Sequence, residues 1–365
     1  MKEKLKKFIQ KLKFKIKEEI NWRCRYHSLK HIDAFVVPAR IFAGITFVYA
    51  LIYTFYNCKT GESRKKLLWT YLLPFVFLYA LDVLDCFIYI IIASIFSENR
   101  ERFLRVYFVT LTLIFVFSII GYYYNILPHD DVYRDEFLRK SLGFVHPNTT
   151  FRYFFGSLMA LYLLDKQKII FSLYGMAVTV VLYNLNDSRT GMITCFTFIL
   201  LANLGVIFKK LIEKVNFKYG YILATAISIL FVFMFHDNAE ANELFSTRPS
   251  LLYDLLVNAK WHLVYGHMKY IYCDNRVVYL IIRNGLLSLL AVNAFYYLVF
   301  KKEKSVELKI LFIVMVIYGM SENLRSLGQC IVPLIGMWSL YDNYAKENIK
   351  ETDENIQKLP KNDNN

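Results

Sequence analysis

The residues most suited to chemistry stand in a short polar break between two long apolar runs. The break is residues 186–191, Asn-Asp-Ser-Arg-Thr-Gly, and the runs are 168–185 and 192–208. Each run is about long enough to cross the roughly 30 Å hydrocarbon core of a bilayer as a helix, so the break is expected at a membrane surface. Arg189 can grip a phosphate with two hydrogen bonds, and Gly191 lets a chain or ligand approach the backbone closely. The plainer interpretation of Arg189 is a snorkelling arginine in a tight turn.

Further candidates lie in the longest polar loop, residues 236–276. Arg248 stands in its first half, and the stretch 251–264 that follows has apolar residues at helical spacing, which predicts an amphipathic helix on the membrane surface. His267 and Asp274 stand near the end of the loop. Taken singly, Arg248 is equally consistent with a solvated charge, and the other two with a polar turn residue and a helix N-cap.

The composition points to a membrane protein. Of the 365 residues, 56% are hydrophobic and 17% aromatic, which is too apolar for an ordinary soluble domain. The formal charge of +14 would suggest nucleic acid in a soluble protein, but the basic residues gather in short loops and at the N-terminus, as the positive-inside rule requires. Nucleic-acid binding is therefore disfavoured. Six scattered cysteines without CxxC spacing indicate neither a zinc site nor a disulfide framework.

We predict an all-α, polytopic integral membrane protein with about ten transmembrane helices in residues 34–341. Residues 1–33 are basic and amphipathic without a continuous apolar run, so they are expected on the anionic cytoplasmic leaflet and not as a cleavable signal. The charged tail 342–365 is expected to be disordered. The predicted spans are about 34–56, 67–96, 103–122, 149–164, 168–185, 192–208, 221–235, 277–300, 308–320 and 328–341.

The orientation follows from the lysines and arginines. A cytoplasmic N-terminus places the basic loops on the cytoplasmic side and returns the C-terminus there. These loops are 100–105, 166–168, 209–218 and 301–309. The loops around His129, Arg189, Arg248 and Glu322 then share the external face. The basic stretch 59–66 disagrees, because this count of spans makes it external.

Arginines, a histidine and carboxylates on one face, beside apolar walls, suit a lipid-linked anionic substrate. In their order these motifs resemble the Wzy-type O-antigen and capsular polysaccharide polymerases, whose architecture the related O-antigen ligases share. The resemblance covers about residues 144–325. Its motifs are Gly143-Phe144-Val145-His146-Pro147-Asn148, Ser188-Arg189-Thr190-Gly191, Arg248, Tyr265-Gly266-His267 and Asp274-Asn275. The chain departs from the commoner pattern of a second glycine after Tyr265-Gly266, because His267 and Met268 stand there.

The resemblance implies a GT-C-like fold and an inverting glycosyl transfer on the outer face of the bacterial inner membrane. The growing glycan would pass from undecaprenyl pyrophosphate to the non-reducing end of a lipid-linked repeat unit. The expected partners are that lipid-linked oligosaccharide, membrane lipids, a flippase and a chain-length regulator. No cofactor is expected.

Each candidate residue then has an expected role. Arg189 and Arg248 would stabilise the charge that gathers on the departing diphosphate. The attacking hydroxyl needs a base, and the sequence does not choose among His267, Asp274 and Glu322. The residues expected to bind substrate are His146, Asn148, Ser188, Thr190, Gly191, Asn275 and Arg325.

Several alternatives compete with this interpretation. The acids in 129–131 and 82–85 could suggest a metal site, but arginine can replace a cation beside a lipid-linked donor. A ligase would share the arginines and differ in its acceptor. A flippase or other transporter should show a repeat, broken helices and charges at the bilayer midplane, and the sequence has no convincing repeat. A non-enzymatic scaffold leaves the one-sided grouping of arginines unexplained.

Overall fold

The computed structural model describes residues 92–93, 96, 99–127, 129–134, 137–144, 146–245, 247–259, 262–266, 273–324 and 329–343. All of them belong to one compact unit, Thr54–Asn365, and the other unit, Met1–Tyr53, lies outside the described residues. The predicted basic segment 1–33, the span 34–56, nearly all of the span 67–96 and nearly all of the tail 342–365 also lie outside them.

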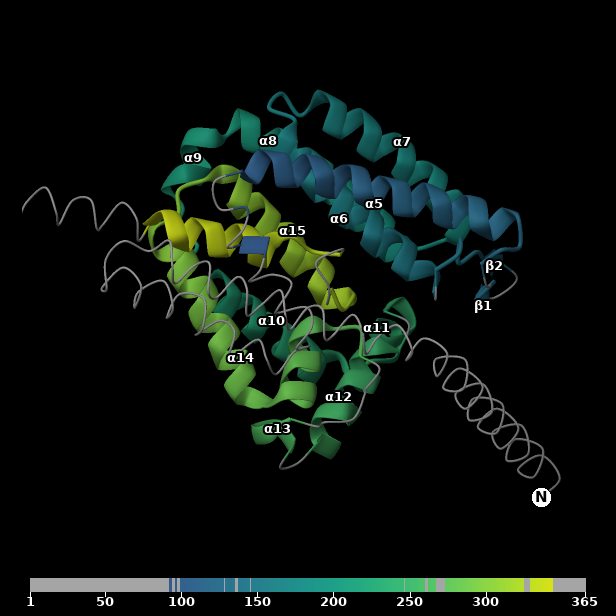
Figure 1. Ribbon diagram of the computed structural model, residues 1–365. Helices are drawn as coiled ribbons and strands as arrows, with labels where there is room; N and C mark the ends of the chain where they lie inside the picture. The colour runs from purple at the N-terminus through teal and green to yellow at the C-terminus, as the bar shows by residue number, and fades with distance from the viewer. Residues whose placement is uncertain are drawn as a thin grey trace, which may run out of the picture. The chain divides into compact units, whose positions relative to one another are not determined.

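The described residues are mostly helical, as the predicted all-α class requires (Figure 1). The helices are α5 (Arg100–Tyr123), α6 (Pro147–Leu164), α7 (Ile169–Asn186), α8 (Arg189–Ile207), α9 (Lys209–Lys214), α10 (Gly220–Phe235), α11 (Ala239–Leu244), α12 (Arg248–Ala259), α13 (His262–Tyr265), α14 (Arg276–Lys302) and α15 (Val306–Ser321). Residues 332–343 are also helical. A small antiparallel hairpin, β1 (Val132–Arg134) and β2 (Phe137–Arg139), departs from the all-α prediction.

Four of these helices, α5, α7, α8 and α14, are long and apolar enough to cross a membrane, and α10 is a shorter apolar helix. Large apolar side chains are exposed along them, for example Phe117 on α5, Ile170 on α7 and Leu200 on α8. Such surfaces are unfavourable in water and suit lipid chains. The described part of the chain is therefore that of a membrane-embedded protein, and every span predicted after residue 100 contains a helix.

The described residues of the long polar loop 236–276 form three short helices. The single amphipathic helix expected at 251–264 is two helices, α12 and α13, and α11 precedes them. Leu252 and Leu256, one turn apart, are buried on α12 as their spacing predicted, whereas Val257, expected on the same apolar face, is 52% exposed.

The eighth predicted span, 277–300, is broken. Gly285 inside α14 has φ 82° and ψ 168°, which is not helical. A Cβ at Gly285 would meet the carbonyl oxygen of Val264 and would lie 2.8 Å from the backbone nitrogen of Gly266. Gly266, at φ 81°, packs in the same way against Arg283 and Asn284. Two glycines thus let the end of α13 lie against the break, where protein covers backbone groups that lipid could not satisfy.

Contacts between the ends of the helices divide these ends into two groups. At one end, which we call the lysine-rich end, Lys309 of α15 donates to the carbonyl oxygens of Ile212, Glu213 and Val215 at 2.8–2.9 Å. Asn203 near the end of α8 donates to Ser172 near the start of α7 at 2.9 Å. These contacts bring together loops that the sequence predicted to share one side.

Other contacts join the same end. Arg100 at the start of α5 makes two hydrogen bonds to Asp342, at 2.6 and 2.7 Å. Ser339 donates to Glu303, directly after α14. The loops predicted on the opposite side meet one another around Glu322.

The break in α14 gives a testable prediction. Gly285→Ala should lower the free energy of unfolding by about 3 kcal/mol, because alanine is strained at positive φ and its Cβ meets backbone. Gly319→Ala is the matched control, since a Cβ there would meet the Cβ of Arg276 at an ordinary 3.4 Å. Thermal unfolding of the purified protein in detergent would measure both. Equal melting temperatures for the two variants would contradict the packing of Gly285 against Val264.

Candidate functional site

A buried carboxylate, Glu322, stands directly after α15 and forms the centre of the candidate site. Only 1% of its side chain is exposed. Its Oε1 accepts a hydrogen bond from Asn148 Nδ2 at 2.6 Å and one from Arg248 Nη2 at 3.4 Å. Its Oε2 lies 3.9 Å from Arg152 Nε. A carboxylate can be buried only with partners of this kind, because losing water costs several kcal/mol.

Four guanidinium groups surround this position, and we call them the arginine cluster: Arg139 on β2, Arg152 on α6, Arg248 on α12 and Arg276 on α14. Arg248 Nε also lies 3.4 Å from Asp274 Oδ2.

Two members of the cluster meet at the residue after Glu322. Asn323 accepts from Arg152 Nη1 at its carbonyl oxygen, at 3.2 Å, and from Arg276 Nη1 at Oδ1, at 3.1 Å. Arg152 and Arg248 thus contact the carboxylates of Glu322 and Asp274, while Arg139 and Arg276 bind the neighbouring amides of Asn148 and Asn323. Four arginines stand against two carboxylates in this set of contacts. The excess of positive charge suits an anionic ligand.

Arg139 fixes the orientation of Asn148. This buried arginine donates from Nη2 to Asn148 Oδ1 at 2.5 Å and from Nε to the carbonyl oxygen of Asn186 at 2.9 Å. Ser188 Oγ donates to the same Asn148 Oδ1 at 3.2 Å. Because Oδ1 already receives two donors, the amide must turn its Nδ2 toward Glu322.

Four helices begin at this site. Asn148 is the second residue of α6, Ser188 precedes α8, Arg248 is the first residue of α12 and Asn275 caps α14. Asn275 also donates from Nδ2 to the carbonyl oxygen of Met320 at 2.9 Å, which joins the start of α14 to the end of α15. Helix starts carry partial positive charge, so their convergence adds to the guanidinium groups in favouring an anion.

Glu322 has an acidity suited to proton transfer. Burial raises its pKa to about 7, the negative charge of Asp274 adds to the rise, and Arg152, Arg248 and Arg139 oppose it. A carboxyl group with this pKa can accept a proton near neutral pH.

The structure brings several of the predicted site residues together and leaves one apart. Asn148, Ser188, Arg248, Asp274 and Glu322 are joined by the contacts described above. Arg189 follows Ser188 in the chain, but 65% of its side chain is exposed and its Nε lies 3.9 Å from Asp187 Oδ1. Its guanidinium group therefore lies at the rim of the site. His267 and Arg325 lie outside the described residues.

The remaining predicted residues have local contacts. His146 is the N-cap of α6, where its Nδ1 accepts from Asn148 N at 3.1 Å. Gly191 allows the close approach expected of it, but the group that approaches is the ring of Phe151, which a Cβ would meet. Thr190 is half-buried beside it.

Sequence reasoning missed Arg139, Arg152, Arg276 and Asn323. Arg152 follows Asn148 by four residues, so helical spacing alone places both on one side of α6. Arg276 and Asn323 adjoin predicted site residues in the chain. Arg139 carried no comparable signal, because its place depends on a hairpin that was not predicted.

Of the acids in residues 129–131, Asp131 stabilises the base of the hairpin. Asp131 accepts from Tyr122 Oη and from Ser141 N, both at 2.7 Å. Burial alone would raise its pKa, but these hydrogen bonds and His129 outweigh burial and lower it. Among the described residues no group of three or more His, Cys, Asp or Glu is placed to hold a metal ion.

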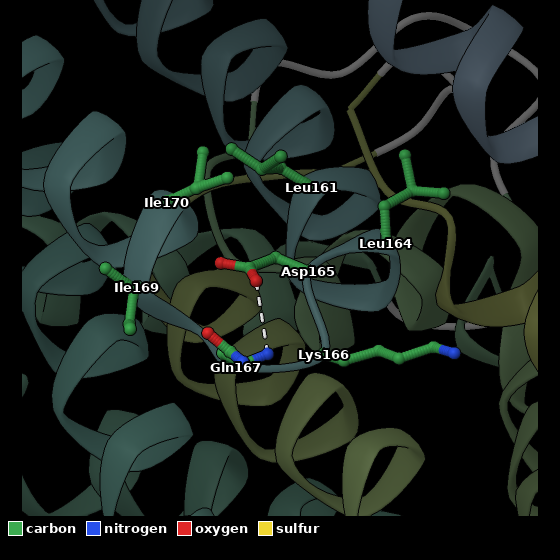
Figure 2. A pocket seen from close by; sticks show the side chains of 7 residues that line it. All are labelled: Leu161, Leu164, Asp165, Lys166, Gln167, Ile169 and Ile170. Atoms are coloured by element: carbon green, nitrogen blue, oxygen red, sulfur yellow. Dashed lines mark hydrogen bonds between the residues drawn. The ribbon is translucent and has the colours of Figure 1, made fainter.

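A hollow of about 530 Å³ lies at the turn between α6 and α7, at the lysine-rich end (Figure 2). Its only carboxylate, Asp165, accepts from Gln167 N at 3.1 Å and Phe171 N at 2.9 Å. The carboxylate is thus used to hold the turn, and the rest of the lining is mainly apolar. The hollow lacks the converging polar groups found around Glu322.

Comparison of the chain with protein-family models, with curated proteins and with solved structures gave no match in any of the three. The function is therefore argued from the site itself.

The hydrogen bonds of Asn148 predict a large effect of its removal. Asn148→Ala should lower the free energy of unfolding by about 2–4 kcal/mol, because Arg139, Ser188 and Glu322 each lose a buried partner. Asn203→Ala is the matched control, since Asn203 is itself exposed and its two hydrogen bonds are exposed or only partly buried. Thermal unfolding in detergent would compare the two, and a smaller loss for Asn148→Ala than for the control would refute this network.

Proposed function

We propose that the chain is a glycosyltransferase of the Wzy polymerase type, which moves a growing glycan from undecaprenyl pyrophosphate to the non-reducing end of a lipid-linked repeat unit. The observation that carries the proposal is the buried carboxylate of Glu322, held among an excess of guanidinium groups where four helices begin. A lipid-linked diphosphate requires positive charge at a membrane surface, and glycosyl transfer requires a base beside it. The choice of the Wzy polymerase type rests on the resemblance in motif order described above.

The arginines would act on the leaving group. When the bond between the sugar's anomeric carbon and the phosphate oxygen breaks, its electron pair departs with the diphosphate, and the charge there grows. Arg248 and Arg152 have side chains 21% and 18% exposed, so a ligand can reach them. Guanidinium groups fixed by α12 and α6 stabilise this charge more in the transition state than in the ground state. Arg189 at the rim would meet the same ligand from outside.

Glu322 would act as the base. The attacking sugar hydroxyl forms its bond to the anomeric carbon from the face opposite the diphosphate, which inverts the configuration, and its proton passes to Glu322. Asp274 is a weaker candidate, because its side chain is 22% exposed and that of Glu322 is 1% exposed. Arg139 and Asn148 would be positioning residues that hold Glu322. The scheme needs no metal, since arginine takes the role of the cation.

The proposed setting is the bacterial inner membrane. About ten spans would place both termini in the cytoplasm, the lysine-rich end at the cytoplasmic leaflet and the arginine cluster at the outer leaflet, in a GT-C-like fold. The sorting of helix ends into a lysine-rich end and an arginine-containing end supports this orientation. A flippase would deliver the repeat units, and a chain-length regulator would act on the product.

One observation favours a transporter as the alternative function. The break at Gly285 in α14 is a feature of transporters, whose sites are built at interrupted helices. The arginine cluster argues for the enzyme, because its guanidinium groups lie within two turns of a helix start or on β2, and not at the middle of a span.

The decisive experiment is to incubate the purified full chain with a defined undecaprenyl-pyrophosphate repeat unit. A ladder of products separated by one repeat is expected. Movement of the lipid-linked unit across a vesicle membrane without a ladder would identify a transporter. Transfer to a non-glycan acceptor only would identify a ligase.

The raised pKa of Glu322 predicts the pH profile of the reaction. Because the ionised carboxylate accepts the proton, kcat should rise with pH through about 7 and fall about tenfold per unit below it. Glu322→Gln should lower kcat by about a hundredfold or more and remove this limb. Glu213→Gln, at an exposed position on α9, is the control. A limb near pH 7 that persists in Glu322→Gln would assign the base to another residue.

Substitution of Arg248 or Arg189 should reduce the amount of polymer formed. In cells that lack the native copy, Arg248→Ala should reduce polymer formation by about 10²–10³-fold, because the leaving diphosphate loses a fixed donor. Arg189→Ala should also abolish long chains while leaving expression intact. Arg105→Ala, whose partner is Glu101 on the exposed side of α5, is the control. Gel separation of the polysaccharide would measure chain length, and normal chains in both site variants would count against the proposal.

A further inference from the structure

The short helix α9 has an amphipathic pattern at the lysine-rich end. Phe208, Leu211, Ile212 and Val215 have the spacing of one helical face, and Lys209, Lys210, Glu213 and Lys214 stand on the other. No residue of α9 is buried, and the side chain of Leu211 is 63% exposed. An apolar helical face left open beside a row of lysines is unfavourable in water.

The lysines of α9 form no ion pair in the described part of the chain, although Glu213 stands on the same face of the helix. The ion pairs found there include none to Lys209, Lys210 or Lys214. Three acids outside α9 at the lysine-rich end have other partners. Asp342 pairs with Arg100, Glu303 accepts from Ser305 N at 2.7 Å, and Asp165 holds the turn between α6 and α7.

A single buried lysine fixes α9 in place. Lys309 lies inside the protein and donates to three carbonyl oxygens at the C-terminal end of α9. Carbonyl oxygens at a helix end lack intrahelical donors, although that of Ile212 also accepts from Val215 N at 3.1 Å, and the positive charge suits the negative end of a helix. α9 is therefore held against α15 through its backbone, which leaves its side chains free to meet something else.

We propose that α9 binds anionic phospholipid headgroups, with its apolar face at the level of the acyl chains and its lysines at the phosphates. α9 directly follows α8, one of the helices suited to cross the membrane, so it lies where a bilayer surface would be. Lysine is a compact charge that contacts lipid phosphates without fixed geometry, and interfacial helices combine lysines with apolar side chains in this way. The exposed Lys301 and Lys304 at the same end extend the positive surface.

The occupant is a lipid and not a nucleic acid or an acidic protein. Phe208, Leu211 and Val215 are exposed together with the lysines, and acyl chains cover such residues while a phosphate backbone does not. The surface also adjoins the exposed apolar residues at the end of α8, Val206 and Ile207. The inference does not depend on the proposed enzymatic function.

The test uses the full chain in nanodiscs of phosphatidylcholine, with a trace of spin-labelled phosphatidylglycerol or spin-labelled phosphatidylcholine. Electron paramagnetic resonance measures the fraction of each label that the protein immobilises. The native protein should prefer phosphatidylglycerol, and replacing Lys209, Lys210 and Lys214 together by Gln should reduce that preference by about fivefold or more. One lysine near an anionic surface contributes about that factor at low salt.

The matched control replaces the same three lysines by Arg, which keeps the charge and should keep the preference. Raising the salt to about 1 M should shrink the native preference, because the Debye length falls to about 3 Å. Thermal unfolding in detergent should be unchanged in both triple variants, since these lysines lack ion pairs among the described residues. A Gln variant with the native preference would overturn the proposal, as would an Arg variant that loses it.

Discussion

Glu322 cannot be buried unless cationic and amide groups from distant segments come to it. Those groups arrive from α6, α12 and, through Asn148, from β2 and the start of α8. One carboxylate therefore fixes the relative positions of four loops at one end of the helices. Removing any one partner would leave a charge or a donor unsatisfied in a region of low dielectric, which is costlier than the gain from any single contact.

Much of this arrangement could be predicted, because membrane proteins obey few and strong constraints. Apolar runs of spanning length predicted the helices after residue 100, and the distribution of lysine and arginine grouped the described loops after that residue as the contacts do. From the sequence alone, that grouping predicted Arg248, Asp274 and Glu322 on the same side of the membrane. The contact of Arg248 with both carboxylates is the consequence.

The rest depends on geometry that a linear pattern does not carry. Arg283, Asn284 and Gly285 interrupt the apolar run, but the pattern alone does not tell a polar stretch inside one helix from a break. The structure shows the break, because the Gly266 backbone occupies the space beside Gly285. Arg189 is exposed although Ser188 beside it is buried, and the polar pattern of residues 186–191 does not distinguish the two. Arg139 reaches the site through β2, and a three-residue strand leaves little periodicity to detect.

The two ends of the helices differ in their basic side chains, with arginines around Glu322 at one end and lysines on α9 at the other. Arg139, Arg152 and Arg248 make directional hydrogen bonds around a buried carboxylate, for which a planar, permanently charged fork is suited. At the other end the cations that face outward on α9 are lysines, which retain their water and tolerate a fluid partner. α15 joins the two, with Lys309 near its start and Glu322 just past its end. Because Lys309 fixes α15 to α9 at one surface, the height of Glu322 above that surface is set by the length of one helix, at about 1.5 Å per residue. A carboxylate held at a fixed height would suit the lipid-linked substrate that we propose, since its diphosphate would lie at a depth set by the bilayer and not by the protein.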